Sequence, residues 1–260
     1  MNILEKIVAF KRKEVEERKK TTPVGVLEES SFFTRRTLSL KESLLTRTGV
    51  IAEFKRRSPS RGVINDRVRV EDVTKAYAAA GASCLSVLTD EEFFGGTSDD
   101  LRAARVNSIP ILRKDFMIDE YQIVEARAIG ADVILLIAAC LSPAEVQRMA
   151  RFAGSLGLEV LLEIHSEEEL EHICEETPIV GVNNRDLKTF TVDIERSIRL
   201  SKRIPAGKLL VAESGINDTA TILHMKNAGF QGFLVGEHFM KEEDPGAAFA
   251  AFVGELTKNI

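Results

Sequence analysis

The chain has 260 residues, of which 44% are hydrophobic and 29% are charged, so it can bury a large core under an ordinary soluble surface. The formal net charge of −5 argues against nucleic acid or an anionic membrane as the main partner. Any anionic substrate must therefore be held by local cations.

Cysteine and histidine usage argues against two further kinds of site. The three cysteines are far apart and form no CxxC pair, which disfavours a disulfide framework and favours a reducing cytoplasm. The four histidines lack metal-ligand spacing, so we expect no metal site. The longest strongly apolar run, residues 131–140 apart from Asp132, is far shorter than the ~20 residues that a membrane span needs.

Residues 1–47 predict a helical extension. An apolar stripe at helical spacing comprises Ile3, Leu4, Ile7, Val8 and Val15. A second apolar element comprises Phe32, Phe33, Leu38, Leu40, Leu44 and Leu45. The extension either caps the bottom of the fold or forms a lid near a substrate, and both remain open here. The mixed charges of KRKEVEERKK argue against a signal or transit peptide.

From residue 48 onward the chain repeats a helical stretch, a glycine and a buried strand. The glycines suit the left-handed position that ends a helix and are Gly81, Gly130, Gly157 and Gly229. Each precedes an apolar run that is typical of a strand covered on both faces. Further strands are predicted at residues 49–54, 109–114, 179–183 and 208–213. Ser142 and Pro143 form a good helix start, as N-cap and first helical residue.

Eight alternating strand–helix units predict an α/β fold, a closed (β/α)8 TIM barrel over residues 48–260 that forms one domain with the extension. A barrel of this kind takes about 250 residues. A doubly wound open sheet is the alternative. It is disfavoured because the glycine-rich dinucleotide fingerprint is missing after every predicted strand.

The first predicted strand leads into the segment VIAEFKRRSPSRG. Glu53 and Lys55 are two residues apart, so their side chains point to the same side of the strand. Two opposite charges at the end of an apolar strand are costly unless that side opens on a cleft. A polar loop with Ser58 follows. Charged strand ends and polar loops build the active sites of parallel barrels, which makes this end a candidate site.

Other predicted strands place charged or polar side chains at the same level. Lys114 shares the inward face with Leu112, so Arg113 points outward. Further inward or strand-end residues are Glu163, Asn183, Arg185, Glu213 and Ser214. A lone charge at a strand end is more often a rim residue or half of a salt bridge. Six inward charges at one level nevertheless favour an active site. His165, beyond Glu163, is interpreted as a loop residue.

The ends of the last two strands, in ESGI and VGEHF, suit a phosphate group. Loops at these positions of a TIM barrel often bind phosphate through backbone N–H groups. Gly215, Gly236 and the amide of Glu237 are the candidates, together with Ser58 in the first loop. The Glu237 side chain is expected to turn away from a dianion.

Together these residues resemble the indole-3-glycerol phosphate synthase family over nearly the whole chain. The motifs that carry the resemblance are IAEFKRRSPSRG, LTDEEFFGG, ILRKDF, LLEIH, GVNNRDLKTF, AESGI and FLVGEHFM. The resemblance implies a carboxy-lyase of tryptophan biosynthesis. Its substrate is 1-(2-carboxyphenylamino)-1-deoxyribulose 5-phosphate, which is converted to indole-3-glycerol phosphate by ring closure, decarboxylation and dehydration, without a cofactor.

The resemblance also implies roles for residues. Lys114 is the general acid on the ketone and Glu163 the general base of the elimination. We expect burial and the like charges of Lys55 and Arg185 to lower the pKa of Lys114 toward neutrality, where proton transfer is efficient. Lys55 and Arg185 hold the anthranilate carboxylate or stabilise developing charge, with Glu53 orienting Lys55. Lys55 is also an alternative general acid.

The remaining implied roles concern positioning and binding. Asn183 and Ser214 position Glu163, its water or polar groups of the substrate, which Glu213 also contacts. Glu237 stands where many relatives carry a small hydroxyl residue, so a side-chain contact to phosphate is not expected there. The aryl pocket is expected to comprise Phe94, Phe116, Leu135 and Phe190.

Three rival functions stay open. A phosphoribosyl-anthranilate-type isomerase usually wants a Cys and an Asp near the ends of the first and fifth strands, where this chain has Lys55 and Glu163. A catalytically silent binder would not need both Lys114 and Glu163. A Schiff-base aldolase could use Lys114 as its nucleophile. For the favoured function we expect a cytoplasmic monomer whose partner is a small phosphorylated substrate, with no nucleic acid and no membrane.

Overall fold

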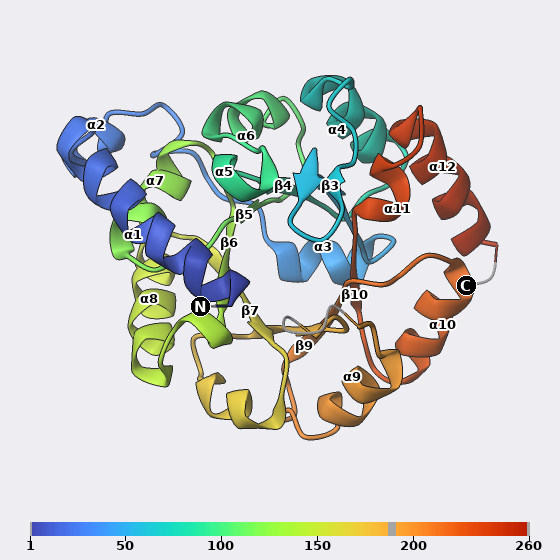
Figure 1. Cartoon of the computed structure of the whole chain (residues 1–260). Coiled ribbons are helices and arrows are strands. Elements are labelled where there is room, and N and C mark those ends of the chain that lie inside the picture. The colour runs from blue at the N-terminus through green and yellow to red at the C-terminus, as the bar shows by residue number, and fades with distance from the viewer. Residues whose placement is uncertain (1, 187–190, 259–260) are drawn as a thin grey trace.

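A parallel β-barrel forms the centre of the molecule (Figure 1). The computed structural model describes residues 2–186 and 191–258. Within that part, the closed barrel comprises β1 (Val50–Phe54), β4 (Cys84–Leu88), β5 (Ile111–Lys114), β6 (Val133–Ile137), β7 (Glu159–Ile164), β8 (Ile179–Asn183), β9 (Leu209–Glu213) and β10 (Gly232–Val235). Each strand pairs in parallel with the next along the chain, and β1 pairs with β10 to close the ring. The predicted TIM barrel is confirmed, and the open-sheet alternative is wrong.

Helices surround the barrel (Figure 1). The longer ones are α4 (Val70–Ala79), α6 (Ser98–Ala104), α7 (Glu120–Ala128), α8 (Pro143–Ser155), α9 (Ile194–Ser201), α10 (Thr219–Asn227) and α12 (Pro245–Leu256). The predicted helix-ending glycines all have positive φ, which confirms their left-handed conformation. Ser142 caps α8 by accepting the N–H of Glu145, and Pro143 is the first helical residue, as predicted.

Short elements follow several strands at their carboxyl ends. They are the antiparallel pair β2 (Arg57–Ser58) and β3 (Gly62–Val63), the helices α5 (Glu91–Phe94) and α11 (Glu237–Met240), and the 3-10 helices η1 (Ala138–Cys140) and η2 (Glu167–His172). In a parallel barrel this end carries the loops that are free to build a site.

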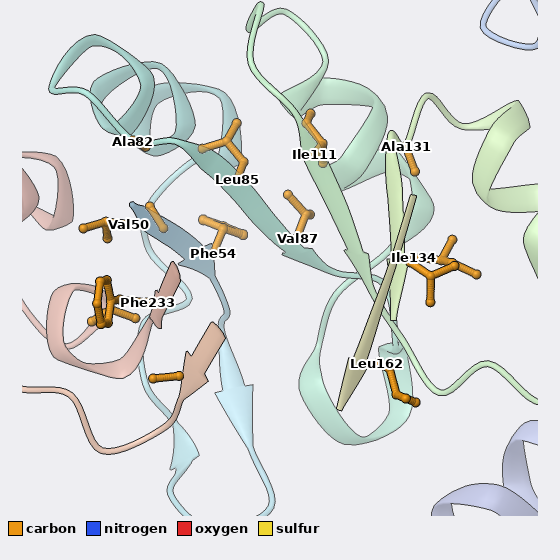
Figure 2. Close-up of a cluster of buried hydrophobic side chains, with 14 of the residues drawn as sticks. Val50, Phe54, Ala82, Leu85, Val87, Ile111, Ala131, Ile134, Leu162 and Phe233 are labelled. Atoms are coloured by element: carbon orange, nitrogen blue, oxygen red, sulfur yellow. The ribbon is translucent and has the colours of Figure 1, made fainter. Parts of the chain in front are cut away.

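Alternate strand residues form two separate cores. The outer core lies between strands and helices and includes Val50, Leu85, Ile111 and Phe233 (Figure 2). The inner core fills the barrel and includes Ile51, Cys84, Leu112, Leu161 and Val211. Since side chains alternate along a strand, Lys114 follows Leu112 on the inner face. Arg113 points outward as predicted, where it is fully buried and paired with Glu125.

The N-terminal extension reaches both ends of the barrel through α1 (Ile3–Thr21), α2 (Val24–Glu28) and α3 (Leu40–Thr46). Helix α3 closes the bottom: Leu40 and Leu44 belong to the inner core. Ser43 Oγ also donates a 2.5 Å hydrogen bond to the carbonyl of Ser83, just before β4. Helix α1 lies at the opposite end, where Ile3, Leu4 and Ile7 line a cavity. The two locations left open by the sequence are thus both occupied, by different helices.

A buried lysine attaches α1 to the top of the barrel. The Nζ of Lys11 lies 2.8 Å from Oδ2 of Asp90 and 3.0 Å from Oδ1 of Asp115. These two aspartates follow β4 and β5, so the contact joins the extension to two neighbouring strand ends. None of the helices in the described ranges is long and apolar enough to cross a membrane.

Candidate active site

One cavity of about 490 Å³ opens at the carboxyl ends of the strands, within the ~300–1,000 Å³ typical of small-molecule sites. Its lining contains every predicted site residue that the structure describes: Glu53, Lys55, Ser58, Phe94, Lys114, Phe116, Leu135, Glu163, Asn183, Arg185, Glu213, Ser214, Gly215, Gly236 and Glu237. Phe190, predicted for the aryl pocket, lies outside the described residues. The fold therefore brings together side chains from β1, β5, β7, β8 and β9 that are far apart in the sequence.

The Glu53–Lys55 pair forms at the end of β1 as their spacing suggests. Lys55 Nζ lies 2.6 Å from Oε1 of Glu53, and Ser86 donates a 3.3 Å hydrogen bond to the other carboxylate oxygen. Burial raises the pKa of Glu53, but Lys55 and then Lys114 lower it, and the net shift is downward. Glu53 is thus an ionised, anchored carboxylate in direct contact with the Lys55 side chain.

The expected low pKa of Lys114 is wrong. Its Nζ lies 2.5 Å from Oε2 of Glu213 and 3.5 Å from Oε2 of Glu163. Burial lowers the pKa of Lys114, but Glu213, Glu163 and Glu53 together raise it well above its ordinary value. The electrostatic environment is set by three carboxylates rather than by Lys55 and Arg185, so Lys114 is an ammonium at neutral pH.

Two carboxylates share Lys114 and differ in protonation. Burial raises the pKa of Glu163, but Lys114 and His165 outweigh it and the net shift is downward. Burial raises the pKa of Glu213 to about 7, against the opposing effect of Lys114 and with a further rise from Glu163. Because the two acids interact strongly, they titrate as a pair. Near neutral pH the cluster therefore holds an ammonium, an ionised Glu163 and a Glu213 that can exchange a proton.

Two neighbours lie close to one oxygen of Glu163. Asn183 Nδ2 donates a 3.0 Å hydrogen bond to Oε1 of Glu163. Nε2 of His165 lies 3.0 Å from the same oxygen. The other oxygen, Oε2, faces Lys114. The Asn183 contact agrees with the positioning role expected for this residue.

His165 was not among the predicted site residues. It follows β7 in a loop, as interpreted from the sequence, but its side chain is only 10% exposed and contacts Glu163. The missed signal is the spacing: residues two apart along an extended segment point to the same side, so Glu163 and His165 resemble the Glu53 and Lys55 pair.

Backbone geometry after β9 is unusual and specific to this end of the cavity. Ser214, with a φ of 67°, is the one non-glycine residue with positive φ in the described ranges. Asn184 Nδ2 donates a 2.7 Å hydrogen bond to its carbonyl oxygen. Strained residues of this kind cost roughly 1–3 kcal/mol and cluster at functional sites. Gly215 follows with a φ of 71°, and a Cβ there would lie 2.3 Å from Cγ1 of Val192.

The side chain of Glu237 contacts two arginines. Its Oε1 lies 2.9 Å from Nε of Arg61, and its Oε2 lies 3.9 Å from a terminal nitrogen of Arg185. A Cβ at the preceding Gly236 would lie 2.7 Å from Oε1 of Glu53, so only glycine fits between β1 and β10 at this point. The region thus offers cations and close backbone approach around the residues predicted for phosphate.

Apolar side chains form another part of the lining. The rings of Phe94 and Phe116 have centroids 6.0 Å apart and are tilted by 38°. Leu135 belongs to the inner core and borders the cavity. The lining also includes Ile3, Leu4 and Ile7 of α1, which the sequence only suggested as a lid. One region of the cavity therefore suits an aromatic group, while glycines and cations border another.

The sequence profile of the indole-3-glycerol phosphate synthase family matches residues 4–252. The chain belongs to the indole-3-glycerol phosphate synthase family. It is 48% identical over 254 residues to the indole-3-glycerol phosphate synthase of Bacteroides thetaiotaomicron, covering 97% of this chain and 98% of that one. It is 45% identical over 260 residues to that of a Polaromonas species, with 97% and 98% covered. The family assignment makes the chain a carboxy-lyase of tryptophan biosynthesis, as the resemblance implied.

Solved structures with little sequence identity share the fold. A mutant tryptophan synthase α-subunit from Pyrococcus furiosus matches with a TM-score of 0.61 at 15% identity, over 82% of this chain and 98% of that one. A 3-hexulose-6-phosphate synthase from Salmonella typhimurium matches with a TM-score of 0.64 at 12% identity, over 82% and 100%. These similarities concern the barrel alone.

Proposed function

We propose that the cavity converts 1-(2-carboxyphenylamino)-1-deoxyribulose 5-phosphate to indole-3-glycerol phosphate, carbon dioxide and water, with Lys114 as general acid and Glu163 as general base. The observation that carries these roles is the position of the Lys114 ammonium, which lies within 3.5 Å of both Glu213 and Glu163 inside the cavity. A proton donor and a proton acceptor are therefore adjacent where the substrate binds.

In the first step, the ring carbon that bears the carboxylate attacks the ketone carbon, and the ketone oxygen takes a proton from Lys114. A raised pKa does not prevent this transfer, because the oxygen that develops is more basic than an amine. It ensures that Lys114 holds its proton at neutral pH. Lys55, which Glu53 orients, and Arg185 bind the carboxylate or stabilise the developing charge. Lys55 is the alternative proton donor.

In the later steps, the carboxylate leaves as carbon dioxide and its bonding electrons return to the ring. The new hydroxyl group then takes up a further proton and leaves as water, while Glu163 accepts the proton that the substrate loses as the double bond of the new ring forms. The lowered pKa of Glu163 keeps it ionised for this task. Asn183 fixes its Oε1, which leaves Oε2 directed toward Lys114.

The two ends of the substrate bind to different parts of the lining. The phosphate rests on the backbone at Gly215, Gly236 and Glu237, with Ser58 from the first loop and the nearby cations of Arg61 and Arg185. The Glu237 carboxylate withdraws from the dianion by keeping its contact with Arg61. The aryl group lies against Phe94, Phe116 and Leu135. We place this reaction in the cytoplasm and assign it to a monomer.

The rival functions are less well supported by the same geometry. The rival isomerase reaction usually uses a Cys and an Asp as its acid–base pair, but the ends of β1 and β7 carry Lys55 and Glu163. A silent binder has no need for the contact between Lys114 and the two carboxylates. A Schiff-base aldolase needs a neutral amine, whereas the surrounding carboxylates keep Lys114 protonated. Borohydride trapping with substrate tests the aldolase directly.

The test of the reaction is indole fluorescence on adding the carboxyphenylamino-deoxyribulose phosphate to purified, metal-free protein. The chain contains no tryptophan, so a new indole signal must come from the product. We expect a signal that persists with chelator present. Bound substrate without signal supports the silent binder, and a signal lost with chelator shows that the chemistry needs a metal.

A further inference from the structure

We propose that His165 is a positioning residue: it is an imidazolium, held between Glu163 and Glu169, that keeps Glu163 ionised and fixes its Oε1. The inference rests on the general-base role proposed for Glu163. His165 is absent from the described residues that line the cavity, so we expect it to act through Glu163 and not by touching the substrate.

The geometry places the imidazole between two carboxylates. Nε2 of His165 lies 3.0 Å from Oε1 of Glu163, and Nδ1 lies 3.4 Å from Oε2 of Glu169. The backbone N–H of His165 also donates a 2.6 Å hydrogen bond to Oε2 of Glu169. Glu169 therefore restrains the main chain of His165 by a hydrogen bond, while the two ring nitrogens approach Glu163 and Glu169 at ion-pair distances.

Burial strengthens the electrostatic interactions among these three side chains. The side chains of Glu163 and His165 are 5% and 10% exposed, and that of Glu169 is 17% exposed. Burial lowers the pKa of His165, but Glu163 and Glu169 raise it to about 10. The same contact lowers the pKa of Glu163. Each partner thus stabilises the charged form of the other at neutral pH.

The other titratable neighbours do not take over this role. Lys114 on β5 also lowers the pKa of Glu163, but it faces Oε2 and is shared with Glu213 on β9. Cys140 in η1 is neutral, because burial and the charges of Glu163 and Glu169 raise its pKa to about 12. Asn183 on β8 binds Oε1 without a charge. His165 is therefore the cation that faces Oε1, on the side of Glu163 away from Lys114.

The first test reads the charge of His165 without using activity. The chain has four histidines, so their imidazole nitrogens can be resolved by NMR, and His165→Gln identifies the signal of His165. We expect imidazolium shifts for His165 up to at least pH 8. In Glu163→Gln its titration midpoint falls by about 1–3 pH units, the effect of one adjacent opposite charge. A neutral His165 at pH 7 in the unaltered chain overturns the proposal.

The second test reads the effect of His165 on catalysis. In His165→Gln, the acid limb of the kcat/KM profile should move to higher pH by about 1 unit or more, because the Glu163–Glu213 pair loses a neighbouring cation. At neutral pH, kcat should fall by roughly tenfold or more with little change in KM, since proton transfer depends on placement. Glu169→Gln should shift the limb in the same direction by less.

His224→Gln is the matched control. His224 is exposed on α10 and pairs with Glu195 at 2.7 Å, away from the cavity, so its replacement should change neither the profile nor kcat. An unchanged acid limb in His165→Gln, beside an inactive Glu163→Gln, overturns the inference and leaves the proposed function standing. Normal turnover in Glu163→Gln would show that Glu163 is not the general base. The proposed function would then fail independently of the charge of His165.

Discussion

Lys11 Nζ lies 3.0 Å from Oδ1 of Asp115, and neither side chain is exposed to solvent. Lys11 belongs to α1, whereas Asp115 directly follows Lys114 at the end of β5. The helix whose Ile3, Leu4 and Ile7 line the cavity is therefore attached, by buried charges, to the strand that carries the proposed general acid.

Replacing Lys11 by methionine should destabilise the fold. Lys11→Met leaves Asp90 and Asp115 buried without their shared cation, and breaking a buried pair in this way costs about 3–5 kcal/mol of unfolding free energy. Urea unfolding measures the loss. Lys13→Met, on an exposed position of the same helix, should stay within about 0.5 kcal/mol of the unaltered chain. Equal stability of the two variants would show that the buried cluster does not stabilise α1.

Loss of the proposed acid or base should abolish most turnover without unfolding the barrel. Lys114→Ala and Glu163→Gln should each lower kcat by roughly 10²-fold or more, the scale of general acid–base catalysis. The indole fluorescence assay gives the rate, and circular dichroism checks the fold. Near-normal kcat in either variant would show that the replaced residue is not the proposed acid or base.

Arginine variants separate the two candidate acids. Lys114→Arg keeps a cation beside Glu213 and Glu163, but a guanidinium does not release its proton in proteins. We therefore expect Lys114→Arg to lose far more kcat than Lys55→Arg, which retains a cation beside Glu53. The reverse order in the same fluorescence assay would assign the proton transfer to Lys55.

The folded state should become less stable as Glu213 ionises. Burial raises its pKa from 4.5 to about 7, so between these values the folded chain binds more protons than the unfolded one. The free energy of unfolding therefore falls as pH rises through this window, by about 1 kcal/mol or more. Glu213→Gln should flatten this fall in urea unfolding between pH 5 and 8. Parallel curves for the two chains would rule out the raised pKa.

A methyl group at Gly215 should impair substrate binding. In Gly215→Ala the new Cβ meets Val192 at 2.3 Å, so the loop beside the proposed phosphate site must shift. We expect kcat/KM to fall by about tenfold or more, the effect of one lost hydrogen bond to a charged group. Gly207→Ala is the control, because Gly207 also has positive φ, at 87°, but nothing lies within 4 Å of its Cβ. Equal kcat/KM in both variants would exclude a role for close backbone approach.

Sequence patterns were sufficient for the barrel and for the direction of its side chains. Because strand residues alternate between two faces, Leu112 in the inner core is enough to place Lys114 in the cavity and Arg113 outside. A glycine ends α4, α7, α8 and α10 just before the next strand, so much of the repeated strand–helix unit follows from local chemistry. The same alternation could have identified His165 from its spacing to Glu163.

Only the tertiary structure decided the charges of the site and the place of the extension. The pKa of Lys114 depends on Glu213, which is 99 residues away in sequence and 2.5 Å away in space. Electrostatic energy varies with distance and burial, neither of which a linear pattern contains. The apolar stripes of α1 and α3 indicated that each segment packs against the barrel, but they did not indicate at which end. The contacts of Ile7 with the cavity and of Leu44 with the inner core decided at which end.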